Sequence, residues 1–195
     1  KISIPPLTTD NTATYGGSWV DYDNDLDLDI LIINTFGVPT YLYRNDGSSN
    51  FIDIAPLSGI PLFTNNNDGH AWGDYDNDGD LDLVLACWDG KNFLCDNNGA
   101  GAFTINATEI VTTESVPESY GSNWVDYDND GDLDLFIATA FGAFNDLFYV
   151  NNGNNNSWVD IRCIGTISNR NAVGARVYVK ANISGQDKWQ MREIN

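Results

Sequence analysis

Apolar and polar positions along the chain follow a strand-like pattern that recurs in three consecutive stretches. Each stretch holds two short apolar runs separated by a turn, at 30–33 and 41–43, at 83–87 and 93–95, and at 135–140 and 147–150. A Gly-containing lead-in ending in Trp comes before the runs, and the first two stretches add a further run at 51–54 and 103–105. No stretch shows sustained helical periodicity. The pattern predicts an all-β protein with four short strands in each repeat.

An acidic nine-residue segment lies directly before the first apolar run of every stretch. The three copies begin at Asp21, Asp74 and Asp126, which are 53 and 52 residues apart, and repeats of this length are typical of propellers or arrays. Aspartate occupies positions 1, 3, 5, 7 and 9 of each copy: Asp21, Asp23, Asp25, Asp27, Asp29, Asp74, Asp76, Asp78, Asp80, Asp82, Asp126, Asp128, Asp130, Asp132 and Asp134. Carboxylates this close together repel one another, so the pattern indicates a bound cation. The alternative is a solvated acidic turn that binds nothing.

Calcium suits such a segment because it takes six to eight hard oxygen ligands in irregular geometry. We expect the carboxylates of positions 1, 3, 5 and 9 and the backbone carbonyl of position 7 to bind it, which gives up to three calcium ions. An EF-hand needs a Glu at position 12 and flanking helices, whereas position 12 here is apolar, so that motif is excluded.

The first acidic segment differs from the other two at position 6. It has Leu26 where the others have Gly79 and Gly131. A sharp turn at this position favours a residue that adopts a positive φ easily. We therefore expect the first segment to bind calcium more weakly than the others.

The charge of the chain is uneven along its 195 residues. Net charge is −19, and residues 1–161 carry 26 acidic and 3 basic side chains while residues 162–195 carry 2 acidic and 6 basic ones. This shift predicts a domain boundary. Nucleic-acid binding is disfavoured because no basic face is available for phosphates. No apolar run approaches the roughly 20 residues of a membrane span, and the absence of a signal peptide is also what a mature secreted chain would show.

Cysteines, acceptor sequons and the single histidine add little chemistry. Cys87 and Cys95 are expected on neighbouring strands, where a disulfide is one alternative and free thiols the other, and Cys163 leaves an odd count. Sequons occur at Asn106, Asn155 and Asn182, about as often as chance predicts in so Asn-rich a chain. A catalytic role for His70 is disfavoured because the other two repeats have Gly17 and Ser122 at this position. No nucleophile motif accompanies it.

The second acidic segment with its flanking residues, and the tail of the chain, resemble a known family. The stretch 72–83, WGDYDNDGDLDL, followed by a strand and Asn-Asn-Gly, is similar to the FG-GAP/VCBS repeat, the calcium-binding blade of integrin-α-like propellers and of many secreted proteins. The tail, with Trp158-Val-Asp-Ile-Arg162 and Ala172–Val177, resembles the start of an ASPIC/UnbV domain, which follows such repeats in cartilage-acidic-protein-like secreted proteins. The resemblance implies an extracellular protein.

We therefore expect three four-stranded propeller-type blades, an incomplete propeller, followed by a small β-segment. The expected blades span about 1–63, 64–115 and 116–156, and a partial ASPIC/UnbV-like domain spans 157–195. Three blades do not close a ring, so the first and last should expose strand edges that invite pairing with another chain.

The expected function is a non-enzymatic, extracellular, calcium-stabilised structural or adhesion module that self-assembles through open blade edges into a homo-oligomer or filament. The alternative is a carbohydrate- or protein-binding module that uses the turn aromatics Trp88, Phe36 and Phe141, although packing between blades is the favoured role of these rings. Basic tail residues would meet the acidic surface of a neighbouring copy or face solvent.

Overall fold

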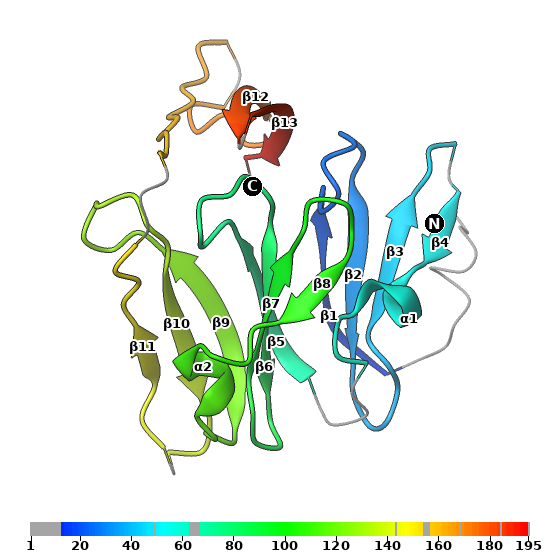
Figure 1. The fold of residues 1–195 in the computed structure, drawn as a ribbon, viewed down its shortest axis with the longest axis vertical. Helices are drawn as coiled ribbons and strands as arrows, with labels where there is room; N and C mark the ends of the chain where they lie inside the picture. Colours follow the sequence, from blue (N-terminus) through cyan, green and yellow to red (C-terminus); the bar gives the residue numbers. More distant parts are fainter. Residues whose placement is uncertain are drawn as a thin grey trace.

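The computed structural model describes residues 13–48, 50–62, 67–142, 144–153, 157–167, 169–183 and 185–194. These residues form three antiparallel sheets that stand side by side, with a two-stranded hairpin across one end of the stack (Figure 1). The expected all-β class is confirmed. The expected boundaries at 63/64 and 156/157 touch ranges outside the described residues.

The first two sheets have the same four-stranded order. The first contains β1 (Thr14–Val20), β2 (Asp29–Asn34), β3 (Tyr41–Asn45) and β4 (Phe51–Asp53), paired in chain order. The second contains β5 (Asn67–Gly73), β6 (Asp82–Cys87), β7 (Phe93–Asn97) and β8 (Phe103–Ile105) in the same order.

The third sheet has three strands among the described residues, β9 (Ser119–Val125), β10 (Asp134–Thr139) and β11 (Leu147–Tyr149). The prediction of a fourth strand in every repeat is therefore wrong for this one. After β11 the chain runs into the polar segment 151–156, whereas apolar runs at 51–53 and 103–105 directly follow the corresponding turns and pair with the sheet edge. The closing hairpin pairs β12 (Arg176–Ile183) with β13 (Gln186–Glu193).

Two single-turn helices, α1 (Ala55–Ser58) and α2 (Ile110–Thr113), interrupt the β-structure. Four residues are too few to show a helical period, which is why the sequence pattern misses them. The first ends at Gly59, which has the positive φ of +87° that terminates many helices. Among the described residues no helix has the length and apolar character required to cross a membrane.

The core lies between the sheets rather than within one of them. Side chains of a strand alternate between its two faces, so Leu83 and Leu85 of β6 pack toward the first sheet while Val84 and Ala86 pack toward the third. All six residues of β6 are buried. The second sheet therefore depends on a neighbour on each side.

In the second and third sheets, the asparagine that opens the Asn-x-Gly turn also joins its sheet to the sheet before it. Asn97 Nδ2 donates to the backbone carbonyls of Tyr22 (2.7 Å) and Leu81 (2.9 Å). Asn151 Nδ2 makes the equivalent contact with the Tyr75 carbonyl at 2.7 Å. We call this contact the Asn latch.

The cysteines of the described residues are free thiols. Cys87 lies on β6 and Cys95 on the neighbouring β7, as expected, but Cys95 stands opposite Leu83 in the register, so no disulfide joins them. Of the three sequon residues, Asn155 lies outside the described residues and Asn182 is in β12. The Asn106 amide donates to Asp96 Oδ2 at 3.0 Å.

The Asn latch gives a stability prediction. Asn97→Ala should lower the free energy of unfolding by about 2–3 kcal/mol, because two buried carbonyls lose their donor. Urea unfolding in calcium-containing buffer measures the loss. The matched control is Asn45→Ala, which removes the same turn residue from the first sheet, where Nδ2 bonds, among the described residues, only to the Leu28 carbonyl of its own sheet. Equal losses in the two variants would show that the contact between sheets contributes nothing.

Candidate metal centres

We call the acidic segments Asp loop 1 (21–29), Asp loop 2 (74–82) and Asp loop 3 (126–134). In each loop three carboxylates offer oxygen atoms that lie within 4.8 Å of one another: Asp21, Asp23 and Asp29; Asp74, Asp76 and Asp78; Asp126, Asp128 and Asp134. The remaining aspartates lie outside these sets: Asp25, Asp27, Asp80, Asp82, Asp130 and Asp132. The structure thus brings positions 1 and 3 together in all three loops.

The aspartate at position 9 fixes the shape of each loop by accepting two backbone N–H groups. One oxygen accepts from the first residue of the following Asn-x-Gly turn and the other from the Tyr at loop position 2. The two N···O distances are 2.8 and 3.4 Å at Asp29, 2.8 and 3.3 Å at Asp82, and 2.9 and 3.1 Å at Asp134. All three side chains are buried. The aspartate that begins the following strand therefore also holds the loop in place through these two hydrogen bonds.

Within the described part of the chain, several carboxylate oxygens of loops 1 and 2 are buried without a hydrogen-bond donor, which tests whether the residues fit a cation. Both carboxylate oxygens of Asp21, and one each of Asp23 and Asp74, are buried and accept no hydrogen bond. Leaving a buried charge unpaired is costly. The donor set is entirely oxygen, which is what calcium prefers. Loops 1 and 2 fit calcium on both counts, and loop 3 fits it by its donor set.

Burial also shifts the titration of these carboxyls. It raises the pKa of Asp21 and of Asp74 to about 6. Burial raises the pKa of Asp29 to about 8 and that of Asp82 to about 9, in spite of the N–H groups that they accept. The charged form of each is disfavoured in the folded loop without a cation.

The aspartate at position 7 joins neighbouring loops. Asn24 Nδ2 of loop 1 donates to Asp80 Oδ1 of loop 2 at 2.8 Å. Asn77 Nδ2 of loop 2 donates to Asp132 Oδ1 of loop 3 at 2.7 Å. The carboxylates of Asp80 and Asp132 thus each accept a hydrogen bond from the preceding repeat, and the carbonyl of position 7 as a calcium ligand stays a prediction.

Position 6 adopts the left-handed backbone that the sequence predicts. The φ angle is +94° at Gly79, +92° at Gly131 and +75° at Leu26, and a non-glycine residue there costs about 1–2 kcal/mol. A Cβ at Gly79 would also collide with Ile183 and Gln190 of the hairpin. Weaker calcium binding by loop 1 stays a prediction.

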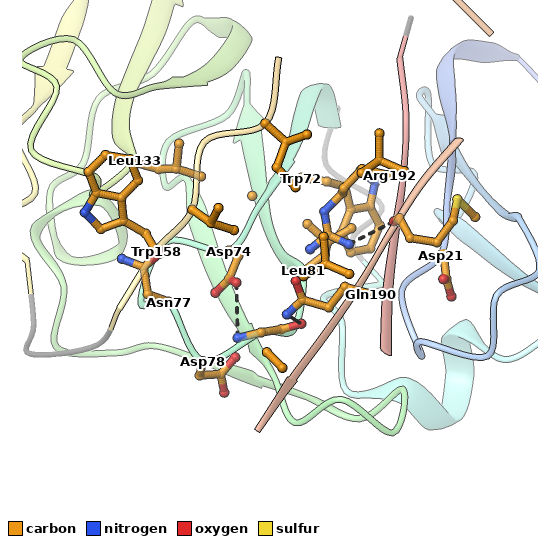
Figure 2. A pocket seen from close by; sticks show the side chains of 18 of the residues that line it. Asp21, Trp72, Asp74, Asn77, Asp78, Leu81, Leu133, Trp158, Gln190 and Arg192 are labelled. Carbon is orange, nitrogen blue, oxygen red and sulfur yellow. Dashed lines mark hydrogen bonds between the residues drawn. The ribbon is translucent and has the colours of Figure 1, made fainter. Parts of the chain in front are cut away.

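The hairpin β12–β13 covers the Asp loops, and sequence analysis does not identify this contact. Lys188 Nζ lies 2.7 Å from Asp80 Oδ2, and Gln190 Nε2 donates to the Gly79 carbonyl at 2.7 Å. The half-buried Arg192 lies between Asp21 and Asp74 and interacts electrostatically with both (Figure 2). Residues of the hairpin, the loops and 157–161 line an open pocket of about 1040 Å³.

Two of the basic tail residues, Lys188 and Arg192, therefore meet the acidic loops of their own chain. The expectation from the sequence was a neighbouring copy or solvent. Lys188 and Arg192 are 108 and more residues away from the loops they contact, and no local spacing indicates such a pairing. The alternation along β13 does place Lys188, Gln190 and Arg192 on one face.

The remaining candidates pack between sheets or lie at the far turns. His70 Nε2 is 2.9 Å from Ser18 Oγ of the first sheet, and burial lowers the pKa of His70. Trp88 makes edge contacts with the rings of Tyr120 and Phe141, so it is at least partly a packing residue. Phe141 itself is 79% exposed.

Comparisons with known proteins agree with this repeat structure. A model of the FG-GAP-like repeat family matches residues 21–85 and 74–137. Cartilage acidic protein 1 of Xenopus tropicalis is 31% identical over 112 residues, covering 56% of this chain and 17% of the relative. The Mus musculus and Homo sapiens proteins of the same name are each 30% identical over 128 residues, covering 63% of this chain and 19% of the relative. The chain thus spans less than a fifth of the length of these relatives.

Among solved structures, a lectin from Agrocybe aegerita is similar with a TM-score of 0.44 and 20% identity, covering 90% of this chain and 46% of the lectin. That lectin is described as recognising non-reducing terminal N-acetylglucosamine. A likeness of this size carries no argument about the ligand of the present chain.

The contact between hairpin and loops gives a second stability prediction. Lys188→Met should lower the free energy of unfolding by about 1–3 kcal/mol, because it leaves the buried Asp80 Oδ2 without a partner. Lys180→Met is the matched control, since its ion pair with Asp187 is exposed and should contribute less than about 1 kcal/mol. Urea titrations of both variants make the comparison. A loss at Lys180 as large as that at Lys188 would contradict the contact.

Proposed function

Because the chain belongs to the FG-GAP-like repeat family, we propose that it is a calcium-stabilised, non-enzymatic structural or adhesion module of the extracellular space. The observation that carries the proposal is the set of buried carboxylate oxygens without partners in the Asp loops. Both the family and the likeness to cartilage acidic protein 1 fit a non-enzymatic extracellular module.

Calcium would supply positive charge where the loops concentrate negative charge. The residues that would hold it are the converged sets of each loop, headed by Asp21, Asp74 and Asp126. The position-9 aspartates stay bound to backbone N–H groups and keep each loop closed. Because Asn24 and Asn77 bond each loop to the next one, calcium that orders one loop would also restrain the loop of the neighbouring sheet.

An extracellular setting would match the supply of the ion. Calcium sites of extracellular modules have dissociation constants on the order of 10⁻⁴–10⁻³ M, which the calcium concentration outside cells can fill. A module stabilised in this way would be well ordered outside the cell and weaker where calcium is scarce.

Millimolar calcium should raise the melting temperature markedly and a chelator should lower it. With a Kd of about 10⁻⁴ M, a site in about 1 mM calcium is at roughly ten times its Kd and adds about 1.4 kcal/mol to the stability of the folded state. Calorimetry of the intact chain with calcium and with chelator measures the effect. Equal melting curves would overturn the metal assignment.

Variants assign that effect to the loops. Asp78→Ala should remove part of the calcium-dependent shift in melting temperature. Asp89→Ala changes the charge equally at an exposed turn outside the loops and should leave the shift intact. A reduced shift in both variants would indicate a general charge effect in place of a site.

A second candidate function is binding of a glycan or protein through exposed turn aromatics. Phe36 and Phe141 are 77% and 79% exposed and both hold a positive φ, of +56° and +57°. Large rings in strained, exposed backbone are unusual, and such residues gather at binding sites.

This candidate predicts saturable binding to a member of a glycan panel that Phe141→Ala weakens at least tenfold. The control is Leu57→Ala, which removes an 88% exposed apolar side chain from α1. Calorimetric titration gives the affinities. Binding that is absent, or equally affected by both variants, would leave the structural role alone.

A further inference from the structure

The β12–β13 hairpin brings two positive charges to Asp loops 1 and 2. Its sequence, 176–193, contains four basic and two acidic side chains. Two of the basic side chains pair with the two acidic ones within the hairpin itself. The other two, Lys188 and Arg192, are the ones that meet the loops. The charge that the hairpin brings to the loops therefore equals that of one calcium ion.

Arg192 acts on the same carboxylates that are left without hydrogen bonds. Its guanidinium interacts electrostatically with Asp21 of loop 1 and with Asp74 of loop 2 (Figure 2). Three of the four carboxylate oxygens of these two aspartates are buried and accept no hydrogen bond from the described residues. Both aspartates also belong to the converged sets that would hold calcium. Arg192 and a calcium ion thus have the same two carboxylates as partners.

Lys188 adds a second positive charge at loop 2. Its ammonium group lies 2.7 Å from Asp80 Oδ2, and it interacts electrostatically with Asp78 and Asp74 as well. These last two aspartates belong to the converged set of loop 2. Loop 2 is therefore within reach of both hairpin cations, and loop 1 is within reach of Arg192.

Loop 3 has a different cover, which makes it a reference within the same chain. None of the ion pairs among the described residues involves loop 3. The Trp158 ring, which is uncharged, lies against Gly131, whereas hairpin residues lie against Gly79 of loop 2. The two carboxylate oxygens of Asp126 accept backbone N–H groups of their own loop, at 3.1 and 3.2 Å.

We propose that Lys188 and Arg192 are built-in counter-ions of loops 1 and 2, and that docking of the hairpin and calcium binding at these two loops oppose each other. A cation beside a carboxylate repels a second cation, so the docked hairpin lowers the calcium affinity of loops 1 and 2. Coupling between two binding events is reciprocal, so bound calcium weakens the docking of the hairpin to the same extent. This antagonism rests on the calcium binding proposed above. Calcium thereby loosens the hairpin while it stabilises the sheets.

Calorimetric titration of the intact chain with calcium tests the effect on affinity. Arg192→Met should raise the calcium affinity of loops 1 and 2 by about fivefold or more, the range of typical coupling between sites. Arg192→Lys keeps the positive charge and should bind much as the unaltered chain does. Arg176→Met is the matched control, because it removes a hairpin cation whose partner is Glu193, and it should leave the affinity unchanged. Equal affinities in Arg192→Met and the unaltered chain would overturn the antagonism.

Loop variants assign the gain in affinity to particular loops. In a chain with Asp126→Ala, which impairs loop 3, Arg192→Met should still give the full gain. In a chain with both Asp21→Ala and Asp74→Ala, which impair loops 1 and 2, Arg192→Met should give none. An equal gain in the two backgrounds would indicate a general effect of net charge and would overturn the proposed role of Arg192.

Hydrogen exchange of backbone amides measures the reciprocal effect on the hairpin. In the unaltered chain, millimolar calcium should slow exchange in the buried strand β6 and speed it in β12 and β13. The same measurement on Arg192→Met shows whether β6 remains protected and the variant is therefore folded. Slower exchange in the hairpin with calcium would show that calcium and the hairpin support each other, and would overturn the antagonism.

The outcomes separate this antagonism from the calcium-stabilised module. An unaltered chain that binds no calcium and has equal melting curves with calcium and with chelator would overturn the module itself. Calcium binding that Arg192→Met does not change, with hairpin exchange equal in calcium and in chelator, would overturn the antagonism and leave the module standing.

Discussion

The crowding of carboxylates in the Asp loops is the constraint on which the other features depend. Position-9 aspartates such as Asp82 accept hydrogen bonds from two backbone N–H groups, which tie each loop to the strands of its own sheet. Position-7 aspartates are satisfied by the neighbouring loop or by the hairpin, as Asp80 is by Asn24 and Lys188. What is left over, chiefly at Asp21 and Asp74, is the negative charge available to a cation. The need of the crowded carboxylates for partners thus determines the shape of each loop, the contacts between the sheets and the position of the β12–β13 hairpin.

Apolar packing and hydrogen bonds have different roles at the interfaces between the sheets. Because side chains alternate along β6, half of them face the first sheet and half face the third sheet. The interior of the stack is therefore made of contacts between sheets. Such contacts fix distance but tolerate sliding, whereas the hydrogen bonds of Asn97 and Asn151 to defined carbonyls fix the register of one sheet against the next. The stack needs both.

Much of this arrangement could be predicted from local sequence. Strand alternation gave the class and nearly all the strands, and the aspartate spacing predicted which segments would converge, because both depend on neighbours within about ten residues. The left-handed backbone at Leu26 followed from its alignment with Gly79 and Gly131. The Asn-x-Gly triplets were interpreted as turns only. Their first residue also bonds to another sheet, and a turn motif carries no information on contacts beyond its own hairpin.

Contacts between distant residues could not be predicted in this way. Lys188 and Asp80 are 108 residues apart, and the one-sided basic face of β13 does not say which acidic surface it meets. The third sheet lacks a fourth strand among the described residues because the polar 151–156 segment offers no apolar run, a point that the repeat pattern alone obscures.

The Asn latch also sets an order of events during synthesis. Tyr22 and Asn97 are 75 residues apart, and Tyr75 and Asn151 are 76 residues apart, which is more than one full repeat in each case. A ribosome must therefore finish most of the next repeat before the Tyr carbonyl of the previous loop finds its donor. During synthesis, each Asp loop would therefore gain its contact with the following sheet only after the following repeat has been made.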